Sequence, residues 1–145
     1  MTIAVDEALA LMTRWHETVI RGGDGDELAS LFLRPEEGRV YVPHGEDISP
    51  DTNHAIHQNL ADERIIQVDP WDITQLCDDP ERARLVGAVY WEGRLISNPT
   101  GPLIKVMVGE DWIVQRVPGS GLKIVLYVNS YHRVLPGSSP LPSFS

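Results

Sequence analysis

The sequence predicts an α+β protein in which a curved antiparallel sheet carries N-terminal helices on its concave face. Helical periodicity marks the segments before about residue 61, and alternation of apolar and polar residues prevails from residue 64 onward. Helices that precede a run of long strands argue for helices packed on one face of a sheet. The length of 145 residues fits one domain. We expect that domain over residues 1–134, followed by a loosely held, Pro/Ser-rich tail over residues 135–145.

Three helices are predicted in the first half of the chain. Apolar residues at helical spacing predict the first, and Gly22 and Gly23 end it; the stripe is Val5, Ala8, Leu9, Met12, Trp15 and Val19. Asp24, with Glu27 three residues later, resembles a capping box and predicts a short second helix. Ser49, followed by Pro50 in the first turn, predicts a third helix that runs to about Ala61.

The strands predicted in the second half alternate with turn sequences. A short early strand covers residues 39–43. Later strands cover residues 65–68 and 71–77, which Pro70 separates, and residues 84–92. Residues 103–108 and 112–117 form either one strand bent at residues 109–111 or a hairpin that turns there. The last strand covers residues 122–134 and follows a Pro-Gly-Ser-Gly turn.

The last strand alternates most clearly. Its even-numbered residues are apolar from Leu122 to Val128 and polar at Ser130 and His132. We therefore expect this side to form the floor of a pocket. The opposite side, with Val125, Tyr127, Asn129 and Tyr131, is expected to face solvent or a second subunit.

Composition excludes several classes of partner. The net charge of −9, without any Lys/Arg cluster, disfavours nucleic acid and anionic membrane surfaces. No apolar run of about 18 residues predicts a membrane span, and we expect a cytoplasmic protein. The single Cys77, with acidic flanks, predicts a buried structural thiol. There is no Gly-rich phosphate loop, so the sequence gives little support for nucleotide use, and we expect no cofactor.

Three segments resemble the NTF2-like, or SnoaL-like, superfamily, which includes ketosteroid isomerase, scytalone dehydratase and polyketide cyclase relatives. They are residues 11–15 (LMTRW), 39–45 (RVYVPHG) and 122–130 (LKIVLYVNS), and their order and spacing support the resemblance over nearly the whole chain. The resemblance implies a cone-shaped α+β fold and chemistry that mostly needs no cofactor. Trp15 replaces the tyrosine of the isomerase oxyanion hole, and the isomerase base would fall near Val42. Steroid-type proton transfer by that constellation is therefore not expected.

The predicted third helix has polar residues on the stripe that should face inward. Its stripe is Asn53, Ile56, His57 and Leu60, and a pocket histidine can move a proton in either direction. The alternative is a hydrogen-bonded histidine at the seam of helix and sheet. His54 and His57 are spaced for metal binding, but without a third ligand we expect no metal site.

Further candidates lie on other elements. His44 follows the short early strand, where it could be a general base or an exposed loop residue. Asp111 could point into the cone as an acid, or could belong to a turn. His132 could lie at the pocket mouth or in solvent. The aromatic residues Trp15, Trp71 and Trp91 could be core, or could form pocket walls for a flat or polycyclic ligand.

These observations lead to one main hypothesis. The chain would be a cofactor-independent cyclase, dehydratase or isomerase acting on a hydrophobic small molecule of secondary metabolism. His57 and His44 would transfer protons, with Asp111 or His132 assisting. One alternative is a non-catalytic module for small-molecule binding or for homodimerisation through the outer sheet face. Another is epoxide or ester hydrolysis by an activated water, which requires Asp111, Asn53 and Arg116 on one side.

Overall fold

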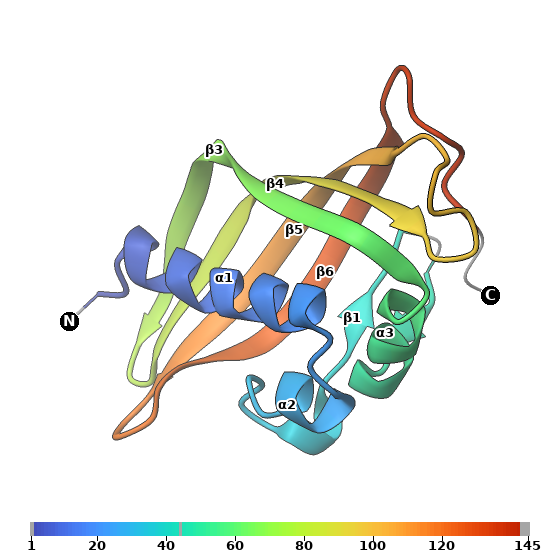
Figure 1. Ribbon diagram of the computed structural model, residues 1–145. Coiled ribbons are helices and arrows are strands. Elements are labelled where there is room, and N and C mark those ends of the chain that lie inside the picture. The colour runs from blue at the N-terminus through green and yellow to red at the C-terminus, as the bar shows by residue number, and fades with distance from the viewer. Residues whose placement is uncertain (1, 44, 143–145) are drawn as a thin grey trace.

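The computed structural model describes residues 2–43 and 45–142, and in them a six-stranded sheet curves around the helices (Figure 1). The helices are α1 (Val5–Arg21), α2 (Gly25–Ala29) and α3 (Pro50–His57), with a 3-10 turn at Pro35–Glu37. The strands are β1 (Val40–Tyr41), β2 (Asp47–Ile48), β3 (Leu60–Asp78), β4 (Glu81–Leu95), β5 (Ile104–Val117) and β6 (Gly121–Val134). The predicted α+β class is confirmed.

The sheet has the strand order β2-β1-β6-β5-β4-β3. The four long strands β3 to β6 pair antiparallel with their neighbours in sequence, as predicted. The short strand β1 departs from the prediction, because it runs parallel to β6. A long connection joins these two strands, so no tight hairpin forces them to be antiparallel. The sheet is therefore mixed.

Helix α1 lies across the concave face of the sheet (Figure 1). Its buried side consists of Ala8, Leu11, Met12, Trp15, His16 and Val19. The helix ends where the sequence predicts, since Gly22 adopts the left-handed conformation with φ of 80°. Helix α3 also begins as predicted, because the Ser49 side chain accepts a hydrogen bond from the backbone N–H of Thr52. It ends at His57, earlier than Ala61.

An aromatic cluster fixes α1 against β5 and β6. The rings of Trp112 and Tyr127 stack with centroids 3.8 Å apart. Trp15 meets the Tyr127 ring edge-on at 5.4 Å. All three residues are buried in the main core. Aromatic pairs in such geometries contribute about 0.5–1.5 kcal/mol each beyond the area that they bury. The cluster thus holds the sheet and α1 together at the concave face.

Two strands are more continuous than the sequence indicates. Strand β5 runs from Ile104 to Val117. Of the two alternatives considered for residues 103–117, the single strand is therefore correct and the hairpin that turns at residues 109–111 is not. Strand β3 continues through Pro70 with a register shift between Val68 and Asp72. Such a bulge accommodates a residue that cannot donate a ladder hydrogen bond.

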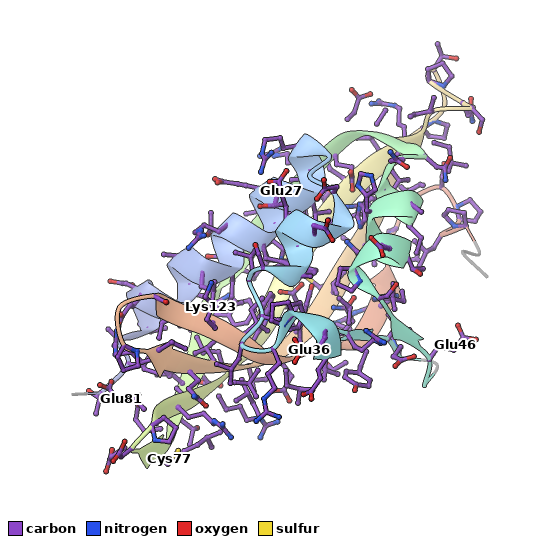
Figure 2. The ribbon with its side chains drawn as sticks, turned by 90° about the horizontal axis from the view of Figure 1, so that it is seen from below. Glu27, Glu36, Glu46, Cys77, Glu81 and Lys123 are labelled. Atoms are coloured by element: carbon purple, nitrogen blue, oxygen red, sulfur yellow. The ribbon has the colours of Figure 1, made fainter. Side chains whose placement is uncertain are left out.

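The far end of the β3–β4 hairpin carries Cys77, near Glu81 (Figure 2). The prediction of a buried thiol is wrong, because Cys77 is exposed and its Sγ donates to the carbonyl of Pro80. The residue lies next to the turn that joins β3 and β4. On the helical side, Lys123 reaches the carbonyl oxygen of Ser30 after α2 (Figure 2).

The described part of the tail is held against the sheet, contrary to the expectation of a loose extension. The backbone N–H of Leu135 donates to the carbonyl of Lys105, and that of Ser139 donates to the carbonyl of Leu103. Leu141 packs against the apolar cluster that contains Trp91. The tail therefore continues the fold beyond β6. Among the described residues, no helix is long and apolar enough to cross a lipid bilayer.

Candidate functional site

A cavity of about 140 Å³ opens between α1, α3 and the concave side of the sheet. Its wall is mainly apolar, with Val19, Val40, Val42, Ile48, Ile56, Leu60, Ile65, Val89, Trp91, Val106, Val108 and Leu141. Its polar lining consists of His16, Asn53, His57, Glu110, Tyr127, Asn129 and His132. No Lys or Arg of the described chain belongs to this lining. An apolar wall with a few converging polar groups is typical of a small-molecule site.

Glu110 forms the centre of the inner polar group. Its side chain is almost fully buried, and three side chains of the described chain approach its carboxylate. The Tyr127 hydroxyl donates at 2.5 Å, and the Trp112 indole N–H donates at 3.0 Å. Nε2 of His16 lies 3.2 Å from the carboxylate. These contacts supply the hydrogen bonds that a buried carboxylate needs in place of water.

Tyr127 is held neutral by this arrangement. Burial, followed by the charge of Glu110 beside it, raises the pKa of the Tyr127 hydroxyl well above its ordinary value of 10.0. The hydroxyl therefore remains a donor to Glu110 at neutral pH. With its ring stacked on Trp112, Tyr127 is fixed at both ends.

His57 forms the outer polar group with Glu63. Nδ1 of His57 lies 2.5 Å from Oε1 of Glu63, and the Trp91 indole N–H donates to the same oxygen at 3.1 Å. Glu63 is buried, whereas 19% of the His57 side chain is exposed. A carboxylate can only accept, so it takes the N–H of Nδ1 and orients the ring, which leaves Nε2 as the other ring nitrogen. His57 therefore presents the arrangement of an oriented base in the cavity wall.

The cavity wall also contains amide groups without partners. Nδ2 of Asn53 and Nδ2 of Asn129 are buried and have no hydrogen-bond partner. Oδ1 of Asn129 is 3.1 Å from Nε2 of His132. The structure thus places Asn53, His57, Trp91 and His132, all predicted from sequence as site residues, on one cavity. Their roles remain predictions.

Asp111 does not enter the cavity, so its predicted role is wrong. Its carboxylate forms two hydrogen bonds with the Arg84 guanidinium, at 2.9 and 2.6 Å. Glu110 enters in its place. The inward residues of β5 have even numbers, which the buried Ile104, Val106, Trp112 and Val114 establish. Successive residues of a strand point to opposite faces, so Asp111 lies on the outer one.

The predicted alternation of β6 is also wrong beyond Ile124, because two bulges interrupt it. The register with β5 shifts between Ile113 and Val114, and again between Gly109 and Glu110. Each extra residue reverses the faces of those that follow. Val128 pairs with the outward Asp111, and the second bulge leaves Ser130 unpaired. Neither residue lines the cavity. Tyr127 and Asn129 line it instead, and the second shift returns His132 to it.

Two of the three predicted tryptophan walls belong to the core. Trp15 and Trp71 are buried in the main cluster and do not line the cavity. Trp71 lies over Gly87, where a Cβ atom would come within 2.3 Å of the indole. The missing side chain at Gly87 therefore makes room for Trp71. His44, the other predicted base, lies outside the described residues.

Several residues of the site were not predicted, although some had a signal in the sequence. His16 is four residues after Met12 and three before Val19, which places it on the buried stripe of α1. Glu110 is in phase with the apolar residues of β5. Glu63 had no such signal, since it lies at an irregular start of β3, next to Asp62 with φ of 54°.

The fold was compared with known proteins. No family model matches the sequence, and no curated protein matches it. Solved structures do match. An NTF2-like superfamily protein from Salmonella enterica is 11% identical, with a TM-score of 0.65, over 94% of this chain and 92% of that one. The hexachlorocyclohexane dehydrochlorinase LinA-type3 from Novosphingobium barchaimii is 14% identical, with a TM-score of 0.62, over 94% and 95%.

A third similar structure is a protein from Streptomyces avermitilis assigned as a dehydratase of the NTF2-like family. It is 20% identical, with a TM-score of 0.61, over 86% of this chain and 93% of that one. These identities establish a shared fold and leave the reaction open, because one fold hosts many functions. The curved sheet, the helices on its concave face and these structural matches together show that the chain has the NTF2-like fold.

Proposed function

We propose that the chain is a cofactor-independent acid/base enzyme, a dehydratase, isomerase or cyclase, that acts on a hydrophobic small molecule held in the cavity. The observation that carries this proposal is the 2.5 Å contact between Nδ1 of His57 and Glu63 in the cavity wall. The structural neighbours that include a dehydrochlorinase and an assigned dehydratase support the same class of chemistry.

In this proposal His57 is the general base. Its Nε2 takes a proton from a carbon of the substrate, and the electron pair of that C–H bond moves toward a neighbouring electron-withdrawing group. Glu63 stabilises the imidazolium that forms, since Nδ1–H remains directed at the carboxylate. The imidazolium then returns the proton to another carbon in an isomerisation, or protonates a leaving hydroxyl group in a dehydration. Each outcome restores neutral His57.

Exchange of carbon-bound hydrogen for deuterium tests this assignment, because it reports proton transfer from any compound that the cavity accepts. The protein is incubated in D₂O with a panel of single-ring ketones and hydroxy ketones, and NMR follows exchange next to the carbonyl. We expect exchange by the wild type, and a loss of about 10²–10⁴-fold in His57→Ala, the usual contribution of a general base.

The control is His54→Ala, because His54 lies on the same helix, three residues before His57, and does not line the cavity. This variant should keep exchange within a few-fold of the wild type. Wild-type exchange in His57→Ala, or no exchange of any panel member by the wild type, would contradict the proposal.

The sequence also suggested two alternative functions. Hydrolysis by an activated water required Asp111, Asn53 and Arg116 on one side of the sheet, and this requirement is not met. Asp111 is bound to Arg84 on the outer face, and Arg116 is bound to Glu7 and Glu81. A non-catalytic binding protein stays a second candidate, because the apolar cavity could hold a ligand without reaction. Ligand binding with no deuterium exchange would favour it.

We also propose that the protein forms a homodimer through the outer sheet face. Tyr127 and Asn129, predicted for that face, turn inward. The exposed apolar residues Ile66, Val68, Val86 and Tyr131 support the proposal instead. Sedimentation velocity on the wild type and on Val86→Lys tests it. A monomeric wild type would contradict it.

A further inference from the structure

Two donors in the cavity wall are left without an acceptor by the protein. Nδ2 of Asn53 and Nδ2 of Asn129 are buried and unpaired, and both residues line the cavity. The structure leaves one further buried donor unpaired among its described side chains, Nε1 of Trp71, which does not line the cavity. A buried donor without a partner costs about 1–3 kcal/mol. Since buried polar groups are almost always paired, the two amides indicate an acceptor that enters the cavity.

The surroundings of the two amides place them on different walls. Asn53 lies on α3, one helical turn before His57, so the two side chains share a face of that helix. Asn129 lies on β6, opposite Glu110 in the register with β5. His132 contacts Oδ1 of Asn129, and the Asn129 side chain also lies beside the Tyr127 hydroxyl, while Nδ2 has no hydrogen bond of good geometry. A ligand between α3 and β6 therefore meets donors from both sides and has His57 beside it.

The charge of the lining argues for a neutral ligand. Glu110 belongs to the lining, Glu63 lies directly behind His57, and no Lys or Arg of the described chain is among the lining residues. A carboxylate or phosphate ligand would meet two buried acidic groups without a guanidinium or an ammonium group to neutralise it. A neutral oxygen acceptor, such as a carbonyl group, satisfies the amides without adding a charge.

The size of the cavity restricts the ligand further. Its volume of about 140 Å³ is close to that of an engineered apolar cavity of about 150 Å³ that takes benzene. A molecule the size of one ring fits this space. A flat polycyclic ligand, as considered from the tryptophan content, would extend through the opening of the cavity.

We propose that Asn53 and Asn129 determine specificity, and that the site takes a compact, neutral molecule of about one ring that carries an oxygen acceptor. This inference rests on the proposed function and deepens it. When His57 removes a proton next to a carbonyl group, the electron pair of the broken C–H bond moves onto the carbonyl oxygen as an enolate. An amide N–H directed at that oxygen stabilises the charge where it develops. Return of the proton to carbon completes the cycle.

The experiment compares three probes of similar shape by NMR titration of the full chain. They are cyclohexanone, which has a neutral acceptor, methylenecyclohexane, which has none, and cyclohexanecarboxylate, which is anionic. We expect cyclohexanone to bind about tenfold more tightly than methylenecyclohexane, a difference that corresponds to about 1.4 kcal/mol. It should also bind more tightly than the carboxylate. Shifts of the side-chain amide signals of Asn53 and Asn129 should accompany its binding.

Two variants test the residues themselves. Asn53→Leu and Asn129→Leu keep the approximate side-chain volume and remove the donor. Each should therefore reduce the preference for the ketone over the hydrocarbon. The double variant should abolish this preference but still bind the hydrocarbon. Asn98→Leu, at an exposed loop position outside the cavity, is the control and should retain the preference. Continued binding of the hydrocarbon in the double variant shows that the cavity is intact.

Equal binding of ketone and hydrocarbon by the wild type would overturn the proposal, and so would tightest binding of the carboxylate. The proposal would also fail if the double variant kept the ketone preference, or if no probe bound. The titration does not depend on proton transfer, so it is repeated with His57→Ala. A ketone preference with exchange that does not need His57 would refute the proposed function alone. Exchange that needs His57, without a ketone preference, would refute the ligand class alone.

Discussion

Two histidine–carboxylate pairs lie at the cavity, each with its histidine in the cavity wall, and they differ in how exposed their side chains are. The side chains of His16 and Glu110 are 8% and 2% exposed. Trp112 and Tyr127 donate hydrogen bonds to the Glu110 carboxylate. His57, by contrast, is 19% exposed and reaches Glu63 from the end of a helix. The inner pair is thus fixed by core packing, whereas the outer pair keeps a ring nitrogen for a ligand. We infer that the inner pair stabilises the fold and the outer pair performs chemistry.

Replacement of each carboxylate by methionine should give the largest difference between the pairs. Glu110→Met leaves the buried donors of Tyr127 and Trp112 without an acceptor, and we expect a loss of about 3–5 kcal/mol in the free energy of unfolding. Glu63→Met should cost about 1–2 kcal/mol, since the Trp91 N–H loses its acceptor but His57 can turn to water. Urea denaturation measures both losses. Equal losses would refute the distinction between a structural and a chemical pair.

Tyr127→Phe tests the inner pair at a single hydrogen bond. The buried carboxylate of Glu110 loses a donor at 2.5 Å, and we expect a loss of about 2 kcal/mol. The raised pKa of Tyr127 also predicts a pH effect. The folded-state pKa lies above the unfolded value of about 10, so this stabilisation is complete below pH 10 or so and is lost as the pH rises from there through the folded-state pKa.

Unfolding free energies measured between pH 8 and 11 should therefore fall more steeply in the wild type than in Tyr127→Phe. Tyr131→Phe is the matched control, because Tyr131 lies on the same strand and is exposed. It should leave the alkaline slope of the wild type unchanged. Parallel slopes for the wild type and Tyr127→Phe would show that Tyr127 does not titrate differently on folding.

Glu63→Gln addresses the outer pair with a smaller structural change. The amide oxygen of glutamine can replace Oε1 and accept from both Trp91 and Nδ1–H of His57, so we expect a stability change below about 1 kcal/mol. The imidazole should therefore keep its proton on Nδ1, and nitrogen-15 NMR of the ring checks this tautomer. Deuterium exchange should still fall by about tenfold or more, since a neutral amide stabilises the imidazolium less than a carboxylate does. Unchanged exchange with the same tautomer would contradict this role of Glu63.

Leu141→Ala should have the smallest effect on stability. The side chain is half-buried at the cavity edge and contacts the cluster that contains Trp91. We expect a loss of about 1 kcal/mol or less, below the range for fully buried leucines. The indole N–H of Trp91 should exchange faster with solvent, as NMR can measure, whereas that of the core residue Trp15 should not. Unaltered exchange at Trp91 would show that the tail does not shield this side of the cavity.

Much of the cavity could be predicted where regular structure continues. The stripe of α3 placed Asn53 and His57 inward, because a helix of eight residues without interruption keeps its faces in phase. The same logic applies to Glu110 within β5, which its even-numbered neighbours would have indicated had the strand been taken as continuous. The prediction of Asp111 failed because Gly109-Glu110-Asp111 has the composition of a turn.

The sequence by itself determined the order of the helices and the long strands, the α+β class and the polar stripe of α3, because these follow from local spacing, capping and turn chemistry, whereas the two-residue strand β2 was expected to be loop. The tertiary structure alone decided which face of β6 meets the cavity. Two bulges shift its register against β5, and a bulge depends on how two strands fit together. It likewise brought Glu63 to His57 and Glu110 to His16, since contacts between distant segments arise from packing.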